Sequence, residues 1–129
     1  MRYAALLGRL CYSAIFIMAA PGHFSRHAIE HAASQGVPMA SVLVPLSGII
    51  ALVGGLSVLF GYKARYGAWL LVFFLAPVTI TMHRFWGLPD PMAAQRQHVM
   101  FMKNLSMLGA ALLIAHGGSG PLSVDDRTK

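Results

Sequence analysis

Charged residues are scarce in this chain, and acidic residues are scarcer still. Of its 129 residues, 11% are charged and 57% are hydrophobic, and only four are Asp or Glu. An ordinary soluble domain is about one-quarter charged. The chain therefore lacks the polar groups that would cover a surface in water, whereas a lipid bilayer could cover it. We predict an integral membrane protein whose first partner is the bilayer.

Cysteine is almost absent, because Cys11 is the only one. One cysteine excludes an intramolecular disulfide and any zinc or iron–sulfur site made of several thiolates. The chain also has no nucleophile elbow, no phosphate-binding loop and no paired carboxylates, so nothing in it supports hydrolysis. Its net charge of +6 would suggest nucleic acid in a soluble protein. Here the basic residues lie mostly between apolar runs, and we expect no nucleic-acid partner.

Long hydrophobic runs make up most of the chain. Each approaches the roughly 20 residues that a helix needs to cross the hydrocarbon core, and none alternates as a strand would. The sequence predicts one all-α domain, residues 1–129, that forms a membrane bundle of four antiparallel transmembrane helices. The predicted spans are 3–20, 42–61, 66–82 and 99–116, followed by a frayed C-terminal tail over 117–129.

Two segments near the N-terminus need a separate interpretation. The first run could be a signal peptide because Arg2 precedes it, but Arg9 splits it and the chain downstream is equally hydrophobic. A retained helix is therefore favoured. A short surface helix is predicted over residues 26–34, with Ser25 as its N-cap and Gly36 as its stop.

The second run carries small residues at a spacing of four, namely Ser47, Ala51 and Gly55. Small residues let helices approach closely in lipid. This stripe predicts a helix at the centre of the bundle. It is also compatible with a face that packs against a partner membrane protein or a second copy of the chain.

Basic residues are more frequent on one side of the predicted bundle than on the other. Arg2, Lys63, Arg65, Arg127 and Lys129 fall on the side of the termini, and Arg26, Arg84 and Arg96 fall on the opposite side. Because cytoplasmic connections are enriched in Lys and Arg, we predict that both termini are cytoplasmic.

Histidine is the most distinctive polar residue, and five of the six lie in the two connections on the predicted outer side. His23, His27 and His31 would share one face of a continuous helix, and two histidines at this spacing can bind one metal ion. Neighbouring methionines would favour copper over other metals. The alternative is that these are ordinary interfacial side chains.

Two charges, Arg9 and Lys103, fall within the spans, where ionisable groups are expensive and are functional candidates by default. Arg9 lies near a membrane face and could instead snorkel to the headgroups or have a structural partner. Lys103 adjoins Asn104, which could form a hydrogen bond across the bundle. Either charge could bind a lipid headgroup, a quinone carbonyl or an oxyanion.

A second group of candidates flanks the last connection. Antiparallel helices would bring together His83 and Trp86, which follow the third run, and His98 and Lys103, which open the fourth. An aromatic ring beside a histidine and a cation suits a quinone head or a small anion. The alternative is an aromatic belt at the membrane interface.

Several short segments, in this order, are typical of one family. They are Leu7-Gly8-Arg9, Gly22-His23-Phe24, Ser47-Gly48, Gly54-Gly55-Leu56, His83-Arg84-Phe85-Trp86 and Phe101-Met102-Lys103-Asn104-Leu105. With them the chain resembles the DoxX family of small bacterial membrane proteins from Leu7 to Ile114. The resemblance departs from the family pattern at His23, where members often carry Lys, and at Ala51, where they often carry Glu.

The resemblance implies a four-helix protein of the bacterial inner membrane, in a family with some members linked to quinone-dependent redox systems. The first functional hypothesis is therefore a membrane subunit of a quinone-linked redox system. The second is a non-catalytic accessory or assembly subunit of a larger membrane complex. The third is a membrane protein with a His/Met metal site. The cofactor that we expect is a quinone or, less favoured, copper or another metal.

Overall fold

The computed structural model describes residues 1–129, and every regular element in it is helical. The elements are α1 (Arg2–Ala19), the 3-10 helix η1 (Ala20–Phe24), α2 (Arg26–Ser34), α3 (Ala40–Phe60), α4 (Ala64–Met82), α5 (Pro91–Gly117) and α6 (Val124–Arg127). Four helical segments are long and apolar enough to cross a membrane: α1 with η1, α3, α4 and α5. The predicted all-α class and the four spans are confirmed.

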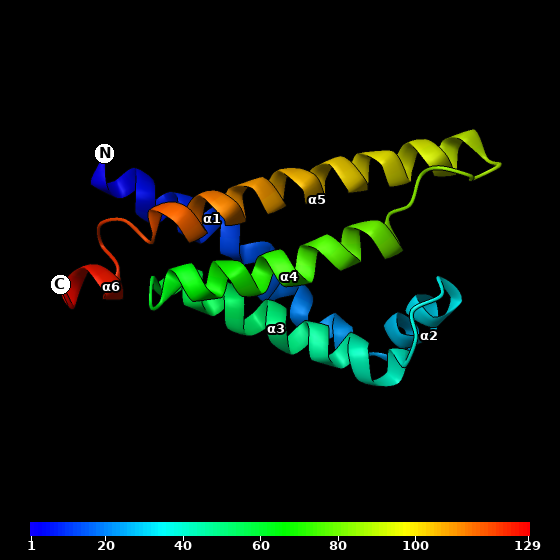
Figure 1. Cartoon of the computed structure of the whole chain (residues 1–129), viewed down its shortest axis with the longest axis horizontal. Coiled ribbons are helices and arrows are strands. Elements are labelled where there is room, and N and C mark those ends of the chain that lie inside the picture. Colours follow the sequence, from blue (N-terminus) through cyan, green and yellow to red (C-terminus); the bar gives the residue numbers. More distant parts are fainter.

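The long helices lie beside one another, with both termini at the same end of the molecule (Figure 1). α3 packs against α1 on one side and α4 on the other, and α4 packs against α5. The short helix α2 lies at the end opposite the termini, where α3 and α4 diverge (Figure 1). The second span is therefore central, as its small residues predict.

Small residues explain why α3 can contact two long helices at once. A Cβ atom added at Gly54 would lie 2.9 Å from the Leu71 side chain of α4, and one added at Gly55 would lie 3.2 Å from the Cβ atom of Phe16 on α1. Ala51 is buried in the same core as Phe16. The Ser47/Ala51/Gly55 stripe packs within this chain, against α1 at Gly55 and against His23 of η1 at Ser47.

The outer surface of the bundle is strongly apolar. Only 24 of the 129 residues are buried, and large hydrophobic side chains such as Phe73 and Leu113 point outward. In water such a surface would mark an aggregation-prone protein. Together with the four spans, it fits a molecule whose outer surface contacts lipid.

The fourth long helix begins at Pro91, earlier than the predicted start near residue 99. Asp90 caps it by accepting a hydrogen bond from the Met92 amide, 3.1 Å away. Proline is favoured at the first position of a helix because its missing N–H needs no partner there. The polar stretch Gln95-Arg96-Gln97-His98 obscured this start signal in a search for apolar runs.

The surface helix over Arg26–Ser34 is confirmed, and so is its N-cap, because the Ala28 amide donates to the Ser25 hydroxyl at 3.1 Å. The prediction of a frayed tail is wrong. Asp125 accepts hydrogen bonds from the amides of Lys63 (2.7 Å) and Ala64 (3.1 Å), and its own amide donates to the Gly61 carbonyl (2.8 Å). The tail therefore docks on the α3–α4 connection, where the first amides of α4 need acceptors.

Candidate functional site

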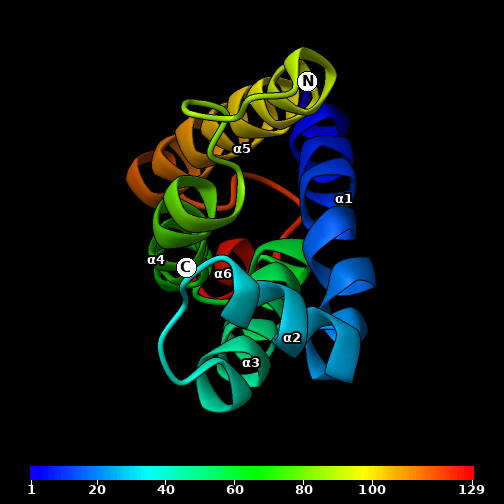
Figure 2. The ribbon, with the colours of Figure 1, turned by 90° about the vertical axis from the view of Figure 1, so that its right-hand side faces the viewer.

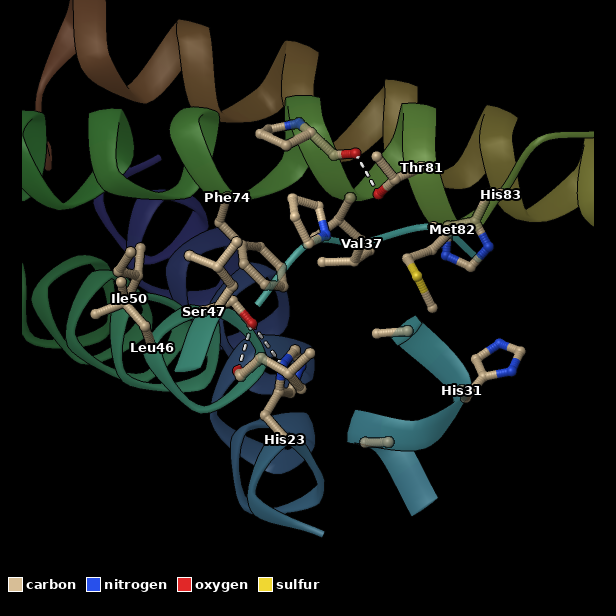
Figure 3. Close-up of a pocket in the computed structure, with 18 of the residues that line it drawn as sticks. His23, His31, Val37, Leu46, Ser47, Ile50, Phe74, Thr81, Met82 and His83 are labelled. Carbon is tan, nitrogen blue, oxygen red and sulfur yellow. Dashed lines mark hydrogen bonds between the residues drawn. The ribbon is translucent and has the colours of Figure 1, made fainter. Parts of the chain in front are cut away.

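A cavity of about 640 Å³ lies between η1, α2, α3 and α4, at the end of the bundle opposite the termini (Figure 3). Most of its wall is apolar, with Leu46 and Ile50 from α3 and Phe73, Phe74 and Val78 from α4. This size and lining are typical of sites for small organic molecules.

His23 and Ser47 form the first polar pair in this wall (Figure 3). The η1 turn after Pro21 brings His23 against α3 at Gly48, where an added Cβ atom would lie 2.6 Å from that of His23. The Ser47 hydroxyl donates to the Val44 carbonyl at 2.6 Å and lies 2.9 Å from His23 Nδ1. Because the hydroxyl proton is used, Nδ1 donates to Ser47, and Nε2 of the neutral ring is left as an acceptor.

His83 and Gln97 form the second polar pair. His83 ends α4, and its Nδ1 atom lies 3.1 Å from Oε1 of Gln97 on α5. Both side chains line the cavity. With Nδ1 donating to the amide oxygen, Nε2 is the ring nitrogen of the second histidine that is left without a partner. Three histidines thus line a mainly apolar wall, His23, His31 and His83, and the first and last of them are fixed by hydrogen bonds.

The predicted trio of His23, His27 and His31 does not share one helix face. Ser25 has an extended backbone that separates η1 from α2, so His23 turns toward α3. The rings of His27 and His31 stack on α2 with centroids 6.4 Å apart. No three His, Cys, Asp or Glu side chains are grouped to hold a metal ion, and the predicted metal trio is not assembled.

Of the predicted group of His83, Trp86, His98 and Lys103, only His83 lines the cavity. His98 packs on Phe85 with ring centroids 4.4 Å apart, and Trp86 joins the same aromatic cluster at 5.3 Å from Phe85. Successive helical residues project about 100° apart, so Gln97 faces the cavity and His98 does not. Lys103 is exposed in a shallow hollow beside His98 on α5.

Arg9 and Asn104 are buried away from the cavity lining. Arg9 does not snorkel, because its guanidinium donates to the carbonyls of Leu59 (3.4 Å), Pro121 (3.3 Å) and Leu122 (2.6 Å). These partners lie at the end of the molecule where the tail docks. Arg9 therefore holds the tail against α3 and shares no site with His83.

Sequence reasoning missed the hydrogen-bonding roles of Ser47 and Gln97. Ser47 was noted as a small packing residue, and its position five residues after the start of the apolar run gave no sign of a histidine partner. Gln97 flanks the same connection as His83. Antiparallel pairing of the third and fourth spans could have placed Gln97 near His83. Only the rotation of α5 about its axis decides that Gln97, and not His98, faces His83.

The fold is that of a small helical integral membrane protein with an apolar cavity between its spans. The family model DoxX matches residues 4–84, and the chain belongs to the DoxX family. The resemblance inferred from the sequence is thereby confirmed. The matched range includes His23, Ser47 and His83 and stops before α5.

Curated relatives extend this similarity. Inner membrane protein YqjF of Escherichia coli is 30% identical over 122 residues, which cover 93% of this chain and 88% of that protein. Inner membrane protein YphA of the same organism is 27% identical over 99 residues, covering 77% and 70%. The ER-derived vesicles protein ERV29 of Saccharomyces cerevisiae is 28% identical over 81 residues, covering 63% of this chain and 26% of the yeast protein. No solved structure matches.

Proposed function

We propose that this chain is an inner-membrane protein that binds a quinone or a similar lipophilic carrier in its cavity, as the membrane subunit of a redox system. The observation that carries the proposal is the pair of hydrogen-bonded histidines, His23 and His83, in an otherwise apolar cavity between the spans. The bacterial relatives are named as inner membrane proteins, which supports the location.

A quinone suits this combination of surfaces. Its ring and tail need an apolar slot, and its two oxygens need a few fixed polar groups. A histidine exchanges protons near neutral pH, as quinone reduction and quinol oxidation require. His23 Nε2 and His83 Nε2 are the available ring nitrogens, because each Nδ1 atom is held by Ser47 or Gln97.

The test is to purify the chain from native membranes in mild detergent and to measure quinone, metals and protein partners together. We expect stoichiometric quinone with the unaltered chain and its loss in the double variant His23→Ala/His83→Ala. The matched control is His27→Ala, which changes an exposed histidine that does not line the cavity. Quinone that is absent from the unaltered chain, or retained by the double variant, would overturn the proposal.

The same preparation separates the other two hypotheses. A stoichiometric protein partner without quinone would identify an accessory subunit, and stoichiometric copper would identify a metal protein. The structure provides no favouring observation for either, because α1 and α4 cover the small-residue faces of α3 and the histidine trio is not assembled.

We also propose that both termini are cytoplasmic. The N-terminus, the α3–α4 connection and the docked tail lie at one end (Figure 1), and this end carries the larger group of basic residues. Cytoplasmic ends of membrane proteins are enriched in Lys and Arg. In this orientation the cavity lies toward the outer face of the membrane.

A further inference from the structure

We infer that the cavity is reached sideways from the bilayer, through a portal between α3 and α4, and that α2 is a lid that closes it toward water. The inference rests on the proposed cavity as the binding site and names its ligand class. That class is an amphiphile dissolved in the membrane, with one apolar chain, rather than a water-soluble solute.

The portal is defined by side chains that line the cavity and are also exposed on the outer surface. Leu46 on α3 is 45% exposed and Phe73 on α4 is 68% exposed, and both line the cavity. Both lie within predicted membrane spans. A cavity whose wall continues into the lipid-facing surface is open to lipid at that point.

The portal is a wedge that is closed toward the termini. α3 and α4 touch where Gly54 meets Leu71, and an added Cβ atom at Gly54 would also lie 3.0 Å from the Gly67 carbonyl. From this contact the two helices diverge toward α2 (Figure 1). A molecule in the wedge therefore contacts lipid at its open side and the packed α3 and α4 at its closed end.

The helix α2 closes the wide end of the wedge. Ala32 is buried and packs with Val44 of α3 and Met82 of α4. Arg84, which follows α4, donates from Nη2 to the Gln35 carbonyl at the C-terminus of α2, 3.1 Å away. Figure 2, which looks at this end, shows α2 and its connection to α3 in front of the space between α1, α3 and α4.

Polarity changes along the cavity in the way that an amphiphile requires. The polar groups lie near α2, where His23, His83 and Gln97 line the wall. Ile50, one helical turn further along α3 from Ser47, and Phe73 form the apolar part nearer the Gly54 contact. A head group would lie under the lid, and its chain would extend through the portal into the bilayer.

Nitroxide accessibility in proteoliposomes tests the portal and the lid without any ligand. The labels are attached in a Cys11→Ser background at Ile50→Cys in the cavity, at Ile49→Cys on the lipid-facing side of α3 and at Ser34→Cys on the exposed surface of α2. We expect the cavity label to collide with oxygen, as the Ile49 label does, and to be shielded from a water-soluble nickel chelate. Collision with the chelate equal to that at Ser34 would overturn the inference.

The hydrogen bond from Arg84 to the Gln35 carbonyl of α2 can be tested in the same experiment. Arg84→Met should raise the collision rate of the Ile50 label with the nickel chelate several-fold, because α2 loses its bond to the end of α4. The matched control is Arg96→Met, an exposed arginine on α5 with no such bond. An unchanged collision rate in Arg84→Met would show that this bond does not hold the lid.

A decyl-chain quinone analogue in nanodiscs tests the portal with a ligand. Leu46→Trp should slow its association roughly tenfold, since access then requires the portal to rearrange. Ile49→Trp, a lipid-facing change close by on the same helix, should leave the association rate unaltered. Binding at the same rate in Leu46→Trp would overturn the portal. If the unaltered chain does not bind the analogue, the proposed function fails, and the nitroxide data alone decide the portal and the lid.

Discussion

Arg9 is a buried guanidinium within a membrane-spanning helix. Ionisable side chains inside a span are expensive unless they are paired. Two of its nitrogens donate to three backbone carbonyls, and only Nε is without a partner. One of these carbonyls, Leu59, lies in the last turn of α3, where the helix dipole favours a cation.

Replacing Arg9 should therefore loosen the end of the molecule that carries the termini. We expect Arg9→Met to lower the free energy of unfolding by about 1–3 kcal/mol, because buried carbonyls lose their donor. Thermal unfolding in detergent measures this, and Arg2→Met, an exposed change, is the control. An unchanged unfolding temperature in Arg9→Met would show that the tail is held by other contacts.

Asp125 is the second residue that fixes the tail, and its protonation can be predicted. Burial raises the pKa of Asp125, but hydrogen bonds from the amides of Ala64 and Lys63 and from Ser119, with the charge of Lys129, outweigh burial and hold the pKa below its ordinary value. Because the pKa is lowered, the ionised carboxylate stabilises the docked tail at every pH above the pKa of the unfolded chain, which is about 3.9. This stabilisation is lost as the pH falls through the folded pKa.

A fluorophore at Thr128→Cys, in the Cys11→Ser background, measures docking as anisotropy. We expect high anisotropy at neutral pH and a fall as the solution is acidified below about pH 4. Asp125→Asn should have low anisotropy already at neutral pH, whereas Asp126→Asn, which leaves the bonds to α4 intact, should match the unaltered chain. High anisotropy in Asp125→Asn would contradict this account.

At the scale of elements, α3 is positioned by glycines that face its neighbours. Gly55→Leu would place a Cβ atom 3.1 Å from Cγ1 of Ile17 and 3.2 Å from Cβ of Phe16 on α1. Overpacking of this kind costs about 1–3 kcal/mol. We expect the unfolding temperature of Gly55→Leu in detergent to fall because α1 and α3 are forced apart.

The matched control is Gly109→Leu on α5, where an added Cβ atom would meet nothing within 4 Å. Both variants replace a helical glycine by leucine, so both gain the same helix propensity. The difference between them isolates the contact with α1. Equal unfolding temperatures would mean that α1 and α3 can separate at no cost.

At the scale of the whole molecule, orientation decides which side of the membrane the cavity serves. With cytoplasmic termini, alkaline phosphatase fused after Lys129 should be inactive, because that enzyme folds only outside the cytoplasm. The same enzyme fused after Pro38, in the connection between α2 and α3, should be active. The reverse pattern would place α2 and the cavity on the cytoplasmic side.

The class of the molecule, the number of spans and the family could all be predicted from the amino-acid sequence. An apolar run of about 20 residues must satisfy its own backbone hydrogen bonds in lipid, so its helical state follows from length and hydropathy. The short helix over Arg26–Ser34 followed equally from its cap at Ser25. The same local logic failed at Pro91, since the polar residues 95–98 interrupt the apolar run soon after that cap.

Which polar residues contact one another depends on how the helices pack. A one-residue change in position rotates a side chain by about 100° on a helix, so Gln97 rather than His98 partners His83, and an extended Ser25 separates His23 from His27. The docking of Asp125 on α4 joins residues more than 60 positions apart. Composition and residue spacing do not specify how a helix is rotated about its axis, or which distant residue accepts a hydrogen bond from a given amide. The cavity, the lid and the buried Arg9 therefore depended on how the helices pack.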